Sequence, residues 1–220
     1  MTEIPVLQFA FLDFEASSLD EDSWPIEVGL SWIDENLNVQ TFESLIRPAP
    51  EWPEHAWSPI SAKIHNIPRR DLNDAPDVHT VANDLLVALN GRTALSDAPP
   101  FERHWLDRLC AAADVIDHVS LMDFHTITGR SFSSGALDFL YERLERINAP
   151  HRAGPDSARF ARGWLAGMRR EREMKMGVVA AKRDAAPKEL EIDGSLVKPI
   201  NGYRIAPKLR RQRLFRRRSF

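Results

Sequence analysis

The feature that most constrains the fold is a nearly continuous apolar run at residues 6–12, which ends at two carboxylates. Such a run is typical of a strand that is buried on both faces. Asp13 and Glu15 follow it directly, and residues i and i+2 of a strand point to the same face. Repulsion between these two anions is relieved by a hard dication such as Mg²⁺ or Mn²⁺, which prefers oxygen ligands. A solvated loop after the strand is the alternative interpretation.

The first 50 residues predict an antiparallel meander of three strands. Residues 26–33 alternate apolar with small or polar positions, and turn residues follow at 34–38. A further run at residues 39–46 is typical of a strand and stops at Arg47-Pro48. These strands begin the sheet of an α/β fold.

The rest of the body changes to helical periodicity. Ser58 and Pro59 form the signature of a helix start, with Ser as the N-cap and Pro at the first position. Apolar spacing predicts further helices over residues 77–89, 101–113, 134–147 and 155–175. Short strands are expected at residues 93–96 and 115–122.

Composition limits the classes of protein and of metal site. The chain has 220 residues, 43% hydrophobic and 28% charged, which is typical of one globular domain with an extension. We expect a cytoplasmic protein, since the N-terminus lacks the pattern of a secretory signal and no window has the roughly 18 apolar residues of a membrane span. Cys110 is the single cysteine, which excludes a disulfide framework and a four-cysteine zinc site. Any metal site must therefore use carboxylates and histidines.

Charge divides the chain into two parts. Residues 1–168 carry 13 basic and 26 acidic residues, whereas residues 169–220 carry 16 and 6. We predict a main domain at residues 1–176 and a weakly ordered basic extension at 177–220, with seven basic residues in the run 208–218. The extension either binds a polyanion or folds back on the acidic body.

A histidine and an aspartate surround the start of the last helix. Asp156 lies in its predicted first turn, at the positive end of the helix dipole, where it can act as a metal ligand. His151, on the preceding loop, can accept a proton from water. The alternatives are a helix-start role for Asp156 and a surface position for His151.

The chain resembles the DEDDh 3'-5' exonucleases, the relatives of ribonuclease T, oligoribonuclease and polymerase proofreading subunits. The segments that carry the resemblance occur in the family's order within residues 6–170. They are Phe11-Leu12-Asp13-Phe14-Glu15-Ala16-Ser17, Glu27-Val28-Gly29, Ile64-His65-Asn66-Ile67, Ser96-Asp97-Ala98-Pro99 and His151-Arg152-Ala153-x-x-Asp156.

The resemblance implies a ribonuclease-H-like fold: a mixed five-stranded sheet of a three-stranded antiparallel meander and parallel strands, flanked by helices. It also implies two divalent cations, Mg²⁺ or Mn²⁺, with Asp13, Glu15 and Asp156 as ligands and His151 as general base. Hydrolysis of single-stranded DNA or RNA from the 3' end would then release 5'-mononucleotides. The second motif departs from the family, because Glu102 stands where an Asp is usual. Asp97 is the competing ligand.

Further expectations concern substrate and assembly. Ala16, Ser17 and Leu19 would contact the terminal sugar and base, with ordinary loop packing as the alternative. His65 resembles a segment that lies beside the terminal nucleotide in relatives, with a helix-ending turn as the alternative. Three tryptophans near this region are predicted as core residues, with base stacking as the alternative; they are Trp24, Trp52 and Trp57. Ribonuclease T relatives are often dimers, which makes a homodimer one expected state. The rival interpretation of the whole chain is a nucleic-acid-binding module with weakened catalysis.

Overall fold

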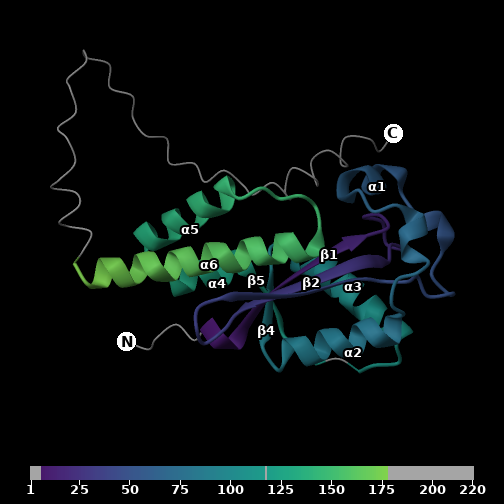
Figure 1. Ribbon diagram of the computed structural model, residues 1–220, viewed down its shortest axis with the longest axis horizontal. Coiled ribbons are helices and arrows are strands. Elements are labelled where there is room, and N and C mark those ends of the chain that lie inside the picture. Colours follow the sequence, from purple (N-terminus) through teal and green to yellow (C-terminus); the bar gives the residue numbers. More distant parts are fainter. Residues whose placement is uncertain (1–5, 117, 178–220) are drawn as a thin grey trace, which may run out of the picture. The chain divides into compact units, whose positions relative to one another are not determined.

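A mixed five-stranded sheet forms the centre of the fold (Figure 1), in a computed structural model that describes residues 6–116 and 118–177. The strands are β1 (Phe9–Ala16), β2 (Pro25–Ile33), β3 (Val39–Leu45), β4 (Thr93–Ser96) and β5 (Leu121–Asp123). Their order is β3-β2-β1-β4-β5. β1 pairs antiparallel with β2 and parallel with β4, and β5 is parallel to β4. The predicted fold class is confirmed.

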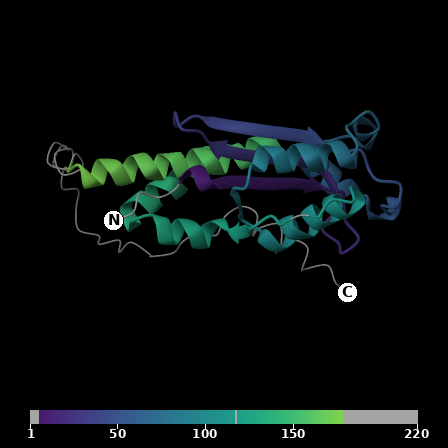
Figure 2. The same ribbon diagram turned by 90° about the horizontal axis from the view of Figure 1, so that it is seen from below.

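Helices cover both faces of this sheet. They are α1 (Pro59–His65), α2 (Val78–Leu89), α3 (Pro99–Ala112), α4 (Phe124–Ser131), α5 (Ser134–Arg146) and α6 (Ala153–Lys175), with short 3-10 turns at Val6–Gln8, Glu54–Ala56 and Arg69–Leu72. One apolar core joins the sheet to α2 and α3, and a second joins it to α4, α5 and α6. Long helix α6 runs along the strands (Figure 2). Of the described residues, 6–116 and 118–172 belong to one compact unit.

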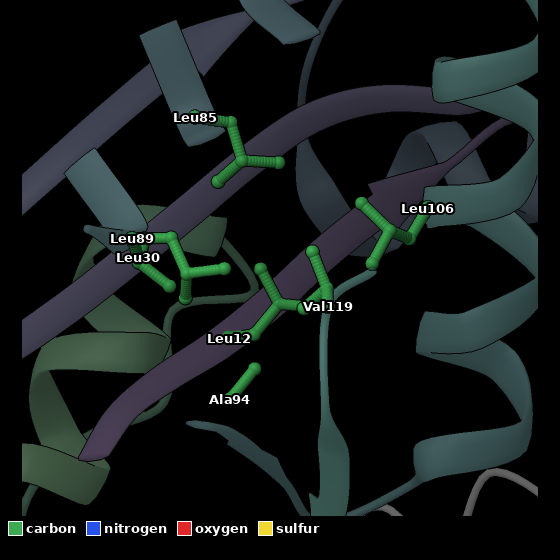
Figure 3. Close-up of a pocket in the computed structure, with 7 residues that line it drawn as sticks. All are labelled: Leu12, Leu30, Leu85, Leu89, Ala94, Leu106 and Val119. Atoms are coloured by element: carbon green, nitrogen blue, oxygen red, sulfur yellow. The ribbon is translucent and has the colours of Figure 1, made fainter. Parts of the chain in front are cut away.

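β1 divides its side chains between the two cores. Leu12 and Phe14 pack on the α2 and α3 side, whereas Phe11 packs against α4 and α6. Because side chains alternate along a strand, Asp13 and Glu15 share the face of Phe11. A small cavity beside Leu12 is lined only by apolar side chains from the sheet, α2, α3 and the segment before β5, so it belongs to the core (Figure 3).

Two predicted strands differ from the structure. The strand expected at residues 6–12 is shifted: residues 6–8 form a 3-10 turn, and β1 runs through Asp13 and Glu15 to Ala16. The two carboxylates are therefore inside the strand, where Gly29 and Glu27 of β2 pair with them. The strand expected at residues 115–122 is reduced to β5, three residues long.

Helix starts follow the capping chemistry. Ser58 caps α1 by accepting a hydrogen bond from the Ser61 N–H at 3.3 Å, as its sequence predicts. Helix α4 was not expected; its N-cap is Asp123, whose carboxylate accepts from the Thr126 N–H at 2.6 Å. Helix α6 begins at Ala153, two residues before the predicted start.

The predicted basic extension is not tested by the described residues. The basic run 208–218 lies outside the described residues, and the division of the chain at 176 stays a prediction. Among the residues that the structure describes, no helix has the length and apolar character needed to cross a membrane.

Helix α6 lies unusually close to strand β2 at Gly29. A Cβ at this position would be 2.1 Å from the backbone C and O of Ala153, the first residue of α6. Real Cβ atoms do not approach backbone so closely, so only glycine permits this contact. Close packing here brings the start of α6 to the end of β1, because Gly29 pairs with Asp13.

We expect Gly29→Ala to lower the free energy of unfolding by at least about 1–3 kcal/mol, since the added methyl forces α6 away from the sheet. Urea denaturation measures the change. Gly129→Ala in α4 is the matched control, because a Cβ there meets nothing within 4 Å. Alanine also favours a helix, so the control should be neutral or more stable by up to about 1 kcal/mol. Equal stability of the two variants would contradict this packing.

Candidate active site

Two buried carboxylates project from β1 next to each other. Asp13 is fully buried and Glu15 is 3% exposed. They are two residues apart on one face of the strand, so their Cα atoms are separated by about 7 Å. Each of them belongs to a separate group of potential metal ligands.

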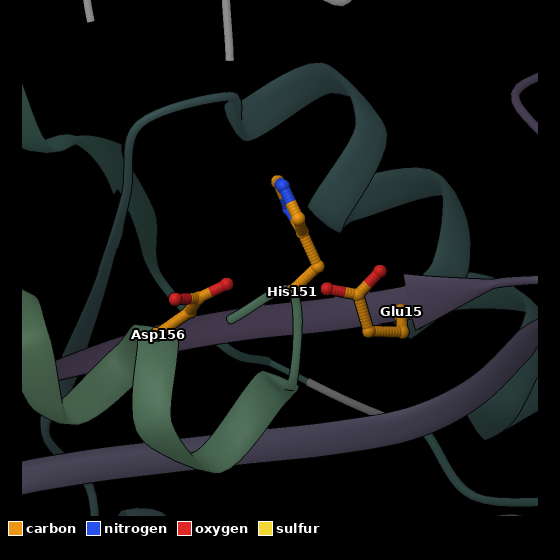
Figure 4. A group of neighbouring side chains, drawn as sticks. All are labelled: Glu15, His151 and Asp156. Atoms are coloured by element: carbon orange, nitrogen blue, oxygen red, sulfur yellow. The ribbon is translucent and has the colours of Figure 1, made fainter. Parts of the chain in front are cut away.

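The first group joins β1 to the start of α6. Single ligand atoms of Glu15, His151 and Asp156 all lie within 4.8 Å of one another (Figure 4). Asp156 is in the first turn of α6, and its N–H donates to the Arg152 carbonyl at 2.9 Å. His151 lies on the loop before α6, with the left-handed φ of 59° that is uncommon for a residue other than glycine. Residues 136 positions apart in the sequence thus meet at one point.

The second group joins β1 to the end of β4 and the start of α3. Asp13, Asp97 and Glu102 each place one carboxylate oxygen within 4.8 Å of the others. Glu102 is in the first turn of α3 and is 1% exposed, whereas Asp97 is half-buried. Both alternatives for the second motif therefore lie beside Asp13.

These two groups form one acidic centre of five carboxylates and an imidazole, because Asp13 and Glu15 are neighbours on β1. Buried like charges repel strongly, and a divalent cation relieves that repulsion. Carboxylate oxygens are the ligands that Mg²⁺ and Mn²⁺ prefer, and an imidazole suits Mn²⁺ or a role in proton transfer. The donor set fits hard divalent cations.

An ion pair between buried Glu27 and half-buried Arg152 fixes the start of α6. Glu27 of β2 is 2% exposed and pairs across the sheet with Glu15. Its carboxylate accepts from the Nε of Arg152 at 3.0 Å, from the Arg152 Nη2, and from the Ala153 N–H at 2.8 Å. The hydrogen bonds to Glu27 raise the pKa of Arg152. Arg152 thereby neutralises the charge of Glu27 beside Glu15, and Glu27 holds the segment that carries His151.

A network of hydroxyl groups adds to this attachment. Ser157, next to Asp156, lies 2.9 Å from the hydroxyl of Ser31 on β2, which lies 2.9 Å from that of Thr41 on β3. Ser157 also donates to the Gly154 carbonyl at 2.8 Å. The first turn of α6 is therefore fixed to two strands of the sheet. The sequence did not reveal these positioning residues, although Glu27 stands within the segment Glu27-Val28-Gly29 that resembles the exonucleases.

The predicted substrate-binding residues lie beyond the end of β1. Ala16 and Ser17 are buried; Ser17 donates its N–H to the Trp24 carbonyl and accepts from the Trp24 N–H at its hydroxyl. Leu19 is half-buried against the core. His65 is buried, and its Nδ1 accepts from the Ile67 N–H at 3.0 Å. These four residues are outside both ligand groups, and their roles stay predictions.

We expect Glu27→Gln to weaken Mn²⁺ binding roughly 10–100-fold, the usual effect of losing a group that orients metal ligands. The substitution removes the charge that holds Arg152 and shifts the start of α6. Calorimetric titration with Mn²⁺ measures the affinity. Glu142→Gln is the matched control, because Glu142 pairs with Arg146 on the exposed surface of α5. If both variants bind Mn²⁺ like the wild type, Glu27 has no positioning role.

Comparison with solved structures places this fold among nucleases, whereas no protein-family model and no curated protein sequence matches the chain. A 3'-exonuclease described as recognising the 3' end of a histone mRNA stem-loop aligns with a TM-score of 0.54 and 16% identity, over 77% of this chain and 82% of its own. E. coli Exonuclease I with a 5cy-dA13 oligonucleotide aligns with a TM-score of 0.55 and 14% identity, over 78% of this chain.

A zinc-bound complex of E. coli Exonuclease I with single-stranded DNA also matches, with a TM-score of 0.53 and 10% identity over 80% of this chain. In both of these comparisons the chain spans 42% of the length of Exonuclease I. Because the sequence identities are only 10–16%, these comparisons establish a shared fold and nothing about activity. The chain shares its fold, a mixed five-stranded sheet flanked by helices, with these exonucleases.

Proposed function

We propose that this protein is a metal-dependent 3'-5' exonuclease that removes 5'-mononucleotides from the 3' end of single-stranded DNA or RNA. The observation that carries the proposal is the convergence of Glu15, His151 and Asp156, from the two ends of the domain, within 4.8 Å. Its fold is shared with nucleases whose structures hold single-stranded oligonucleotides. Residues 1–176 would form the catalytic domain.

The acidic centre would hold two divalent cations through Asp13, Glu15, Asp156 and a second-motif carboxylate. Such cations supply positive charge that favours an attacking hydroxide and stabilises the departing 3'-oxygen. His151 accepts the proton of the attacking water at an imidazole nitrogen. The left-handed backbone of His151, fixed by the Glu27 and Arg152 contacts, holds that imidazole beside Glu15 and Asp156.

Glu102 is the proposed second-motif ligand, since it lies in the first turn of α3 and is buried beside Asp13. Its additional methylene, relative to Asp, extends the carboxylate further from the helix. Asp97, at the end of β4, lies in the same group of ligand atoms and would share that cation. The proposed contacts to the terminal nucleotide come from residues near the end of β1 and from α1: Ala16, Ser17, Leu19 and His65. Ser17, for example, is two residues beyond Glu15.

A second candidate function is a nucleic-acid-binding module with weakened catalysis. The observation in its favour is Glu102 in place of the usual Asp. The two functions differ in their response to metal: a catalytic site binds Mn²⁺ through Asp156, whereas a binding module retains salt-dependent affinity for nucleic acid with little response to metal.

In Mg²⁺ or Mn²⁺, a 5'-labelled single-stranded oligonucleotide should be shortened from its 3' end into a ladder, and Asp13→Asn should slow this at least about 100-fold. Asp13→Asn should also melt at the same or a higher temperature in EDTA, because it removes one charge from a repelling group. Exposed Asp84→Asn is the control and should stay active. Absence of a ladder from DNA and from RNA at high enzyme concentration would exclude the proposed activity.

Calorimetry with Mn²⁺ should show two bound ions for the wild type and loss of at least one for Asp156→Ala, since one shared ligand is removed. The titration needs no substrate, so it separates metal binding from turnover. Wild-type stoichiometry and affinity in Asp156→Ala would contradict the assignment of this ligand.

A further inference from the structure

The guanidinium of Arg69 lies over the rings of two tryptophans. Its guanidinium carbon lies 5.3 Å from the ring centroid of Trp24 and 5.8 Å from that of Trp57. The two rings are themselves 5.9 Å apart and inclined by 31°. Trp24 is buried, whereas Arg69 and Trp57 are half-buried. Contact with two aromatic faces restricts the guanidinium and leaves its N–H groups at the rim to meet a ligand.

In the part of the chain that the structure describes, no acidic side chain forms an ion pair with Arg69. Within the described residues, the side chain of Arg69 makes no ion pair and no hydrogen bond. Its neighbour Arg70 is different, because it pairs with Asp71 at 3.6 Å and is exposed. Residues 57–70 contain three basic residues and no acidic one, within a body where acidic residues predominate. The segment is a local positive region.

Hydrogen bonds connect this region to the end of β1. The Ser17 N–H donates to the Trp24 carbonyl at 2.9 Å, and the Ser58 N–H donates to the Ser17 carbonyl at 2.8 Å. Ser17 follows Glu15 by two residues, a separation of at most about 7 Å. Helix α1 lies beyond the end of β1 at which α6 begins (Figures 1 and 2). Arg69 is thus at the same end of the sheet as the acidic centre.

We propose that Arg69, oriented by Trp24 and Trp57, binds a backbone phosphate of the single strand, upstream of the phosphodiester that is cleaved. The planar guanidinium matches two phosphate oxygens, and a positive group is needed to hold a polyanion beside an acidic centre. The ring faces that Arg69 covers are not available for base stacking. This inference rests on the proposed function, because it assigns a contact to the same substrate.

The first test measures binding of a fluorescently labelled oligothymidylate by anisotropy, with the full chain in Mg²⁺ over a range of salt concentrations. The 3'-terminal linkage of the oligothymidylate is a phosphorothioate, so that hydrolysis is slowed while the upstream phosphates are kept. Arg69→Gln keeps a side chain over the tryptophans but loses the charge. We expect about tenfold weaker binding and a salt slope smaller by about 0.7, the value for one phosphate contact on a single strand. Arg69→Lys should keep the slope and lose less affinity. Arg70→Gln is the matched control and should change affinity less than about twofold.

The second test separates substrate contact from damage to the acidic centre. The p-nitrophenyl ester of thymidine 5'-monophosphate has no upstream phosphate, so Arg69→Gln should hydrolyse it at the wild-type rate. The same variant should show about a tenfold higher KM for the oligonucleotide with little change in kcat. A structural role for Arg69 would lower both activities together.

Equal affinity and salt slope in wild type and Arg69→Gln, or no measurable binding by either, would overturn the Arg69 proposal. An equal loss of affinity in Arg70→Gln would also overturn the Arg69 proposal, because the weaker binding would then come from the overall positive charge of the region and not from one contact. These results leave the exonuclease proposal intact if Asp13→Asn is inactive. Conversely, an inactive wild type that binds through Arg69 would overturn only the exonuclease proposal.

Discussion

Concentrated negative charge in a buried position is the constraint on which the rest of the structure depends. Five carboxylates, from β1, α3, α6 and the residue after β4, approach one another at one end of the sheet. Each costs free energy to bury, and their mutual repulsion adds to that cost. A fold maintains such an arrangement only if the elements that carry the carboxylates are fixed by other contacts, and if cations offset the charge when the site works.

Those other contacts lie where α6 meets β2. Gly29 lets the helix approach the sheet, the carboxylate of Glu27 holds Arg152 and the first N–H of the helix, and the hydroxyl of Ser31 holds Ser157. They act on the residues on both sides of Asp156 and constrain the left-handed backbone of His151. Strained conformations of this kind persist when the surrounding structure determines them, and they are common at functional sites. The rigidity of this junction is what makes a precise ligand geometry available.

The sequence predicted the sheet, most helices and the carboxylates, because apolar periodicity and capping residues are local signals. The limits of β1 were wrong by three to four residues, because the strand continues through Asp13 and Glu15 without the apolar pattern that marks its start. Helix α4 was missed, since Thr126 and Thr128 are weak helix formers and its N-cap Asp123 ends a strand. Glu27 could not be assigned a role, because its partner Arg152 is 125 residues away and only the fold brings them together.

Charge also explains why metal and substrate should bind together. The body that carries the acidic centre has twice as many acidic as basic residues, and its ligand would be a polyanion. Arg69 supplies one fixed positive group beside this centre, but five carboxylates outweigh it. Two divalent cations at the acidic centre would offset most of the negative charge that the terminal phosphodiester meets. Affinities linked in this way are reciprocal. If bound cations raise the affinity for the strand by a given factor, a bound strand must raise the affinity for the cations by the same factor.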